Sequence, residues 1–272
     1  MTIPRLYLPR PLQEQGLYPL DEGHQRYLIN VLRLCCGDAV TLFDGSGWDY
    51  QGRIEKLADG EAAVRIVGRK EIAGAAPRAR ITLAQALPKG AKMEGIVEKA
   101  TELGVSQIIP FHSSRSIPRW EPAKAAARVA RWEKIAVEAA RRCRRPDVPA
   151  IEAVTSFGEM LALAGAGKMP RPVRIIFWEE GGRSFQSLLR DDGIPPPGDF
   201  FFVIGPEGGF TPLEVAAAQE AGFAVASLGN QILRVETASL VILAILQYER
   251  GIFSAPEAPA GGGKQQTPAV ET

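Results

Sequence analysis

The stretch DFFFVIGPEGGFTPLEV, residues 199–215, places two adjacent glycines between a strand-forming run and a helix start. Glycines at such a junction let the backbone approach a ligand closely, beside free N–H groups and the positive end of the helix. A phosphate-binding loop needs a Lys-Ser or Lys-Thr pair, which this loop lacks, and a GxGxxG dinucleotide fingerprint is absent too. Glu207 is the only charged residue of the loop, and its carboxylate suits a hydroxyl, an amine or a sulfonium rather than a phosphate. The loop therefore points away from nucleotide phosphates.

The whole chain has an ordinary globular composition. Its 272 residues are 46% apolar and 23% charged, which suits one large domain or two smaller ones. The longest apolar run, Ala238–Leu246, is far shorter than the roughly 20 residues that span a bilayer, so we interpret it as a buried helix. Prolines and arginines interrupt the N-terminal MTIPRLYLPRPL, where a signal peptide needs a continuous apolar core. These features predict a cytoplasmic protein with no membrane segment.

Cysteine and histidine usage indicates neither disulfides nor a metal site. Cys35, Cys36 and Cys143 form neither an even set nor a metal-ligand spacing, and the chain has only two histidines. We therefore expect no metal to take part in the chemistry.

Charge is strongly polarised along the chain, although the net charge is only +1. Residues 112–145 carry ten Lys or Arg against three acids, a balance of +7, and residues 146–253 carry seven against thirteen, a balance of −6. A basic stretch of this density is compatible with binding an RNA or DNA backbone, or with a solvated helix face. Composition alone leaves both interpretations open.

Two domains are indicated by the order of the local patterns. In residues 1–72, short apolar stretches alternate with turn signals such as Asp44-Gly45 and Asp59-Gly60, which predicts a small β-barrel or sandwich with one helix over residues 21–34. Residues 73–79, AGAAPRA, are predicted to be a linker. Residues 254–272 are rich in Pro, Gly and small polar residues, a composition typical of disorder.

Residues 80–253 alternate strand and helix patterns, which predicts an α/β domain with a mainly parallel sheet. Thr211, Pro212 and Glu214 provide an N-cap, a first-turn proline and a capping-box acid for the helix that follows the glycine loop. In such sheets, ligands bind at the carboxyl ends of strands. Three strand ends, FWEE, GPEGG and SLGNQILR, are therefore candidates for one common pocket.

These fragments, in this order, resemble the SPOUT-class methyltransferases, and within them the RsmE type, which methylates N3 of a uridine in small-subunit 16S ribosomal RNA. The resemblance is carried by RLYLP, YLINVLRLCCGDAVTLFDGSG, LAQALPKGAKMEGIVEKATELGV, SSRS, IGPEGGFTPLE and SLGNQILRVETA. It extends over most of the chain and stops before the C-terminal tail. Cys35-Cys36 replaces a pair that is more often polar, and Val235 stands where Thr or Ala is common.

The resemblance implies a PUA-like β-barrel at the N-terminus and a SPOUT α/β domain with a trefoil knot. It also implies a homodimer and S-adenosylmethionine as cofactor, bound by three loops. On this sequence the implied cofactor-binding residues are Phe177, Trp178 and Glu179 in the first loop, Ile204, Gly205, Pro206, Glu207, Gly208 and Gly209 in the second, and Leu228, Gly229, Gln231, Ile232 and Leu233 in the third. A Val at position 208 is expected to block the cofactor.

Arg234 and Glu236 are the catalytic candidates beside the third loop. Arg234 would stabilise anionic charge on the uracil, and Glu236 would act as a hydrogen-bonding orienter or as a base. The alternatives are that Glu236 caps the last helix and that Arg234 pairs with an acid. Glu207 is predicted either to accept hydrogen bonds from the ligand or to hold its own loop closed.

Four arginines, Arg5, Arg10, Arg115 and Arg119, are predicted RNA contacts, with plain surface charge as the alternative. His24 and His112 lie in no cofactor motif, so we interpret them as structural residues or RNA contacts rather than proton acceptors. Two other functions remain open at this point. One is a methyltransferase of the same fold that acts on transfer RNA, and the other is a non-catalytic RNA-binding assembly factor, for which decay of the cofactor loops would be expected.

Overall fold

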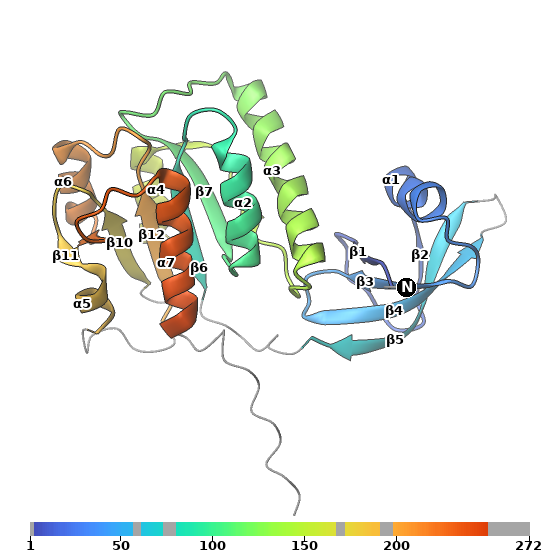
Figure 1. The fold of residues 1–272 in the computed structure, drawn as a ribbon. Helices are drawn as coiled ribbons and strands as arrows, with labels where there is room; N and C mark the ends of the chain where they lie inside the picture. Colours follow the sequence, from blue (N-terminus) through green and yellow to red (C-terminus); the bar gives the residue numbers. More distant parts are fainter. Residues whose placement is uncertain (1–2, 57–60, 73–79, 167–171, 191–197, 250–272) are drawn as a thin grey trace, which may run out of the picture.

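The computed structural model describes residues 3–56, 61–72, 80–166, 172–190 and 198–249. It shows a small β domain beside a larger α/β domain, with helices α2 (Lys92–Glu102) and α3 (Pro122–Arg142) on the side of the larger domain that faces the smaller one (Figure 1). The predicted linker, residues 73–79, and the predicted disordered tail, residues 254–272, lie outside the described residues.

The N-terminal domain is one curled five-stranded sheet with strand order β1-β3-β4-β5-β2. The strands are β1 (Arg5–Tyr7), β2 (Leu17–Pro19), β3 (Ala39–Phe43), β4 (Trp48–Lys56) and β5 (Ala62–Glu71). The predicted turn between β3 and β4 contains Gly45 and Gly47 at φ of +90° and +96°, a region that favours glycine. Leu28, Leu42 and Val64 are fully buried in its core.

The helix predicted over residues 21–34 is shorter and irregular. An α-helical turn, α1 (Glu22–Gln25), continues into a π-helical segment, η1 (Arg26–Val31). The Asp21 carboxylate accepts a hydrogen bond of 2.8 Å from the backbone N–H of His24 and so caps α1.

The C-terminal domain is built on a parallel sheet, as predicted. Its strand order is β11-β13-β10-β12-β6-β7-β8, with β9 also paired to β7, and every pair is parallel. The strands are β6 (Ile81–Ala86), β7 (Gln107–His112), β8 (Ala150–Ile151), β9 (Thr155–Ser156), β10 (Val173–Phe177), β11 (Arg183–Ser184), β12 (Phe200–Ile204) and β13 (Ala224–Ser227). Sequence patterns missed β8, β9 and β11, because two-residue strands carry no periodicity.

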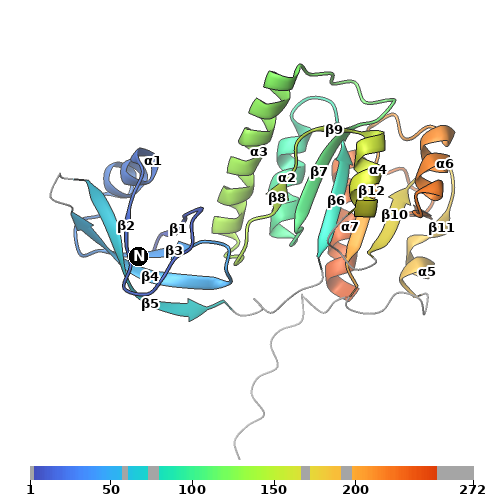
Figure 2. The ribbon, with the colours of Figure 1, turned by 180° about the vertical axis from the view of Figure 1, so that it is seen from behind.

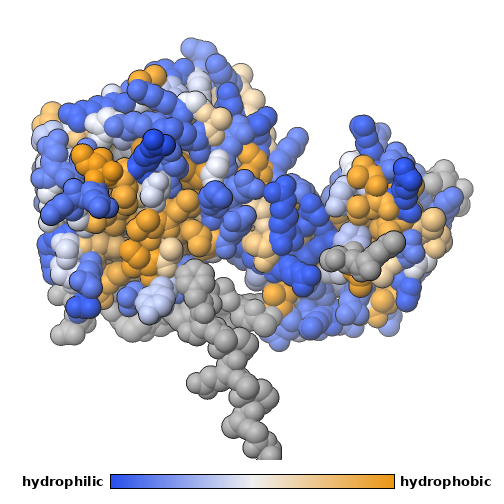
Figure 3. Space-filling model, viewed as in Figure 1, coloured by the Kyte–Doolittle hydropathy of each residue, from blue (hydrophilic) through white to orange (hydrophobic). Residues whose placement is uncertain are grey.

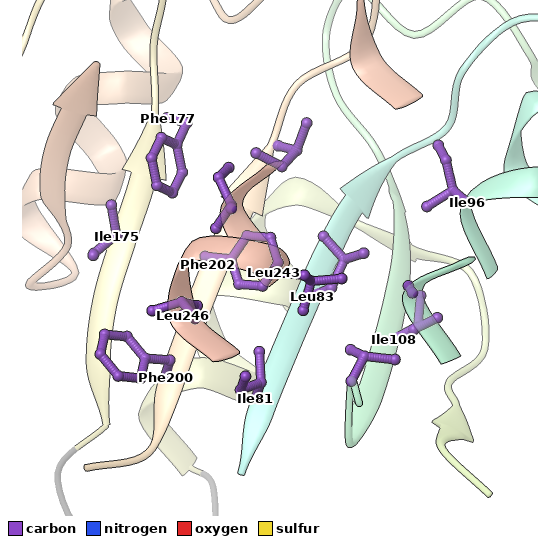
Figure 4. Packing of buried hydrophobic residues seen from close by; sticks show 14 of the residues in the cluster. Ile81, Leu83, Ile96, Ile108, Ile175, Phe177, Phe200, Phe202, Leu243 and Leu246 are labelled. Carbon is purple, nitrogen blue, oxygen red and sulfur yellow. The ribbon is translucent and has the colours of Figure 1, made fainter. Parts of the chain in front are cut away.

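Helices cover both faces of this sheet, so alternate residues of each strand enter different cores. On one face, α2, α3, α5 (Phe185–Leu189) and α7 (Val235–Glu249) pack over side chains such as Ile81, Phe200 and Phe202 (Figure 4). The other face is covered by α4 (Phe157–Ala166) and α6 (Pro212–Glu220), which lie on the near side of the sheet in Figure 2. These two helices pack over Phe201 and Val203. α4 and α5 were not predicted.

The last helix begins earlier than its apolar run suggested. α7 starts at Val235, and two buried polar side chains fix it in place. The Ser239 hydroxyl donates to Gln85 Oε1 of β6 at 2.6 Å, and Gln247 Nε2 donates to the carbonyl of Leu103 after α2 at 2.7 Å. Arg234 and Glu236 consequently stand at the N-terminal end of α7. The trefoil knot stays a prediction from the resemblance, and no helix among the described residues is long and apolar enough to cross a membrane.

Candidate functional site

A cavity of about 700 Å³ lies at the carboxyl ends of β10, β12 and β13. All three predicted strand-end loops line it. The predicted residues in its wall are Phe177, Trp178, Glu179, Ile204, Gly205, Pro206, Glu207, Gly209, Leu228, Gly229, Gln231, Ile232, Leu233 and Arg234. Residues separated by more than fifty positions in the sequence therefore meet at one site, as expected for the edge of a parallel sheet.

Gly208 is the one predicted loop residue that does not line the cavity. A Cβ at this position would lie 3.2 Å from Cβ of Arg115, and the Gly208 carbonyl accepts a hydrogen bond of 2.8 Å from Arg115 Nη1. A valine side chain here would meet Arg115 rather than enter the cavity, so any block of the cofactor would act through displacement of the loop, and the expected effect stays a prediction.

Gly209 is the glycine that the cavity requires. Its φ is +66°, and a Cβ there would overlap the carboxylate of Glu179 in the first loop. Gly229 in the third loop also has a positive φ, of +105°. Glycine at these positions keeps side chains out of the space between the loops and allows a ligand to approach the backbone.

An ion-pair network closes the second loop from the side of α2. Glu207 accepts hydrogen bonds from the backbone N–H of Lys89, at 3.1 and 3.3 Å, and from Lys92 Nζ, at 2.7 Å. Although partial burial opposes ionisation, these hydrogen bonds lower the pKa of Glu207 below its usual range. The hydrogen bond to Glu207 likewise raises the pKa of Lys92. Between the two predicted roles of Glu207, these contacts favour the one that holds the loop closed.

Lys92 is a residue of the site that the sequence did not reveal. It lines the cavity from the first turn of α2 and lies 3.7 Å from Glu236 Oε2 as well as against Glu207. Its partners are 115 and 144 positions away in the chain. In the sequence it is one lysine among several on a helix, so no local signal could have singled it out.

Of the two catalytic candidates, Arg234 lines the cavity, whereas Glu236 does not and lies against the lining residue Lys92. Arg234 is exposed, and Glu236 is half-buried. Glu236 Oε2 is buried and has no hydrogen-bond partner among the described residues. Within the same part of the chain, Arg234 makes no ion pair and the Glu236 side chain makes no capping bond, so neither alternative role is observed.

The loop after β7, which contains the SSRS motif, supports the second loop from the other side. Glu214 is 6% exposed and accepts hydrogen bonds from the backbone N–H of Thr211 at 2.9 Å and from that of Ser114 at 2.8 Å. The predicted capping box is therefore confirmed, and it also joins two loops. Arg115 Nη1 donates to the carbonyls of Gly208, at 2.8 Å, and Phe210, at 3.4 Å.

Arg115 therefore has a role in the protein itself besides its predicted contact with RNA. Arg119 is exposed, and its Nη2 donates to the Ser113 carbonyl at 3.2 Å. Burial, and then the charge of Arg119, lower the pKa of His112 and so favour its neutral form. His112 is not among the residues that line the cavity. His24 lies in α1 beside Asp21, in the other domain.

The structure does not favour the predicted RNA contact of Arg5, because the side chain is occupied within the protein. Its side chain is 8% exposed, and its guanidinium donates to Asp49, to Ala140 O and to Arg145 O. Arg10 is exposed, donates to Pro19 O at 2.7 Å and lies over the ring of Tyr18, so its predicted role stays open.

Much of the positive charge on α3 is paired within the domain. Of the six Lys and Arg residues in α3, four form ion pairs: Arg128 and Arg131 with Glu94, Arg142 with Glu98, and Arg141 with Glu138. For this part of the basic stretch, the structure favours the solvated helix face over a row of phosphate contacts. Among the described residues, no group of three or more His, Cys, Asp or Glu side chains could hold a metal ion.

The fold and the site define a two-domain α/β protein with a small-molecule pocket at the carboxyl ends of a parallel sheet. A family model described as an RNA methyltransferase domain matches residues 75–247, and one described as an RNA methyltransferase PUA domain matches residues 20–67. The chain belongs to this RNA methyltransferase family, in the branch of ribosomal RNA small subunit methyltransferase E.

Relatives resemble the chain over nearly its full length. Ribosomal RNA small subunit methyltransferase E of Synechocystis is 33% identical over 234 residues, which cover 83% of this chain and 71% of the relative. The methyltransferase E of Bacillus subtilis is 28% identical over 244 residues, which cover 88% of this chain and 92% of the relative.

Solved structures show the same fold. The methyltransferase E of Neisseria gonorrhoeae, bound to S-adenosyl methionine, has a TM-score of 0.77 and 33% identity over 91% of this chain and 98% of its own. A Legionella pneumophila methyltransferase solved with the same cofactor has a TM-score of 0.79 and 29% identity, and the match covers 92% of this chain and 98% of the Legionella chain.

Proposed function

We propose that this chain transfers the methyl group of S-adenosylmethionine to N3 of a uridine in the 16S ribosomal RNA of the small ribosomal subunit. The observation that carries the proposal is the cavity itself. Three loops meet there around glycine positions that exclude side chains, in a chain whose relatives have been crystallised with this cofactor. Its volume of about 700 Å³ is within the usual range for cofactor sites.

The side chains of the cavity fit the chemistry of this cofactor. Leu228, Ile232 and Leu233 offer apolar surface to an adenine ring, and the backbone around Gly205 and Gly209 can approach a ribose. Carboxylates at Glu179 and Glu180 line the same space and suit a positively charged sulfonium. A phosphate would be repelled by these carboxylates, which agrees with the lack of a phosphate-binding motif.

S-adenosylmethionine, when bound, supplies an electrophilic methyl carbon, so the protein must orient the uracil ring and help to remove its N3 proton. Glu236 Oε2 accepts no hydrogen bond among the described residues and lies 3.7 Å from Nζ of Lys92 in the cavity wall, so Glu236 is our candidate to accept the N3 hydrogen. Arg234, exposed in the cavity wall, would stabilise the negative charge that deprotonation leaves on the ring. Lys92 lies beside Glu236 and holds Glu207 in place.

The remaining surface would grip the RNA. Extracting a base from a stack costs about a few kcal/mol, which contacts to the surrounding backbone must offset. We assign these contacts to the N-terminal domain, including Arg10, and to Arg115 and Arg119, two exposed arginines in the segment that follows β7. Their positive charge would make binding salt-dependent. Ribosomal subunits are cytoplasmic particles, so we propose that the chain acts there.

A homodimer is the second part of the proposal. Apolar side chains gather over α7 in Figure 3, and Tyr248 on this helix is 72% exposed. A second cavity, of about 680 Å³, lies between α5 and α7 and includes Leu189, Val241 and Ile245. It shares Ser227, Leu228 and Gly229 with the first cavity. A partner subunit on this face would cover apolar surface and adjoin the third loop. Light scattering on the purified chain, compared with an Ile245→Glu variant, tests the dimer.

The test of the activity is methyl transfer from labelled S-adenosylmethionine to unmodified small ribosomal subunits, followed by nuclease digestion and mass spectrometry of the nucleosides. We expect 3-methyluridine at one site, lost in Glu236→Gln and retained in Glu220→Gln, which changes an exposed carboxylate on α6. Methyl transfer to tRNA and not to ribosomal subunits would show that the substrate is tRNA instead. Cofactor binding without any transfer would contradict the assigned substrate, and RNA binding without cofactor binding would indicate an assembly factor.

A further inference from the structure

Arg5, near the start of the chain, is built into the junction between the two domains. Within its own domain, Nε donates to Asp49 Oδ1 at 2.8 Å and the guanidinium lies 3.6 Å from the centre of the Phe43 ring. Across the junction, Nη1 donates to the carbonyl of Ala140 at 3.2 Å and Nη2 to that of Arg145 at 3.0 Å. With a side chain only 8% exposed, Arg5 is held from both sides.

The surface that Arg5 contacts is the carboxyl end of α3. Ala140 lies in the last turn of that helix, so its carbonyl belongs to the negative end, and Arg145 lies in the segment that directly follows the helix. A planar guanidinium with several N–H donors matches two such carbonyls, whereas a lysine ammonium does not. Arg141 of the same turn adds a second bridge, since its Nη1 donates to the Tyr27 hydroxyl at 3.2 Å.

The junction is connected to the cavity through α2. Arg145, whose carbonyl accepts from Arg5, donates through its own Nη1 to the carbonyl of Thr101 at 2.8 Å. Thr101 lies in the last turn of α2, and Lys92 in the cavity wall lies in the first turn of the same helix. With eleven residues, α2 spans about 16 Å. One rigid helix therefore has one end at the junction and the other at the cavity.

We propose that Arg5 is a positioning residue that fixes the orientation of the N-terminal domain relative to the methyltransferase domain. In this way it determines where RNA held by the first domain presents its base to the cavity of the second. The inference rests on the proposed function for its catalytic consequence, whereas the orientation itself is a property of the chain alone. The contacts also explain why an arginine near the N-terminus is buried instead of facing RNA.

Arg5→Lys is the test variant, because it keeps the charge and removes the fork that joins two carbonyls. Arg65→Lys is the matched control, since Arg65 forms an exposed ion pair with Glu55 inside the N-terminal domain. Tyr27→Phe provides a milder second variant, which removes only the acceptor of Arg141. Circular dichroism and the melting temperature establish that each variant is folded.

The orientation is measured as the distance distribution between two spin labels in the full chain, by pulsed electron paramagnetic resonance. One label is attached to native Cys36 and the other to Lys124→Cys, an exposed position on α3, in a background with Cys35→Ser and Cys143→Ser. Each variant is also assayed for cofactor affinity, and for kcat and KM with small ribosomal subunits.

We expect a broader distance distribution in Arg5→Lys, a smaller broadening in Tyr27→Phe and none in Arg65→Lys. Since a misplacement of about 1 Å can cost about 100-fold in rate, kcat/KM for subunits should fall by about 10- to 100-fold in Arg5→Lys, mostly in kcat, with cofactor affinity unchanged. An unchanged distribution in a folded Arg5→Lys variant would overturn the proposal. A fall in RNA affinity without broadening would overturn it in favour of a direct RNA contact. If the wild-type chain methylates no RNA, the proposed function fails while the distance measurement still decides the role of Arg5.

Discussion

Replacing Gly209 by Ala tests whether the glycine loop forms the wall of the cofactor site. At φ of +66°, any side chain costs about 1–2 kcal/mol of folding free energy. The added Cβ would also overlap the Glu179 carboxylate, which must then leave its position in the cavity wall. Gly90→Ala is the matched control, because its φ is +67° and a Cβ there meets no atom within 4 Å.

Both variants should lose about 1–2 kcal/mol of unfolding free energy in urea titrations, since they share the backbone penalty. In Gly209→Ala, holding the displaced Glu179 side chain in an unfavourable rotamer, so that the ligand can bind, costs about 0.5–1.5 kcal/mol of binding free energy. We therefore expect affinity for S-adenosylmethionine, measured by calorimetry, to fall by up to about tenfold in Gly209→Ala. It should not change in Gly90→Ala. Equal affinities in both variants and the wild type would refute the assignment of this loop to the cofactor.

Three further predictions concern the loops around the cavity. Lys92→Met removes the cation between Glu207 and Glu236, so kcat for methyl transfer should fall by about tenfold in a folded protein; an unchanged kcat would limit Lys92 to a surface ion pair. The pKa of Glu207 is lowered in the folded chain, so its stabilising contribution is present above its unfolded pKa of about 4.3 and is lost as the pH falls through the lower folded value. The melting temperatures of the wild type and Glu207→Gln should accordingly differ at pH 7 and converge below about pH 4; a constant difference would contradict the shift. Arg115→Ala should weaken both RNA and cofactor binding, because Arg115 holds the Gly208 carbonyl. Arg119→Ala should weaken RNA binding alone. If the Arg115→Ala and Arg119→Ala variants bind the cofactor equally well, the contact of Arg115 with Gly208 is dispensable for cofactor binding.

Local patterns determined the elements and the loops that form the cavity. Strand-forming runs followed by glycines predicted β12 and its loop, and Thr211 with Glu214 predicted the start of α6. The rule that ligands bind at the carboxyl ends of parallel strands then placed three distant loops together. These predictions succeeded because capping, turn geometry and strand periodicity depend on residues that are close in the sequence.

The tertiary structure alone decided which side chains act together. It brought Lys92 to Glu207 and Glu236, turned Gly208 toward Arg115, and buried Arg5 against the end of α3. Arg5 and Ala140 are 135 positions apart, and no local pattern records that pairing. The sequence shows how many charges a segment carries, but the packing of helices determines whether each charge meets an acid, a carbonyl or the solvent. For that reason the cavity could be predicted from sequence, and the network that holds it could not.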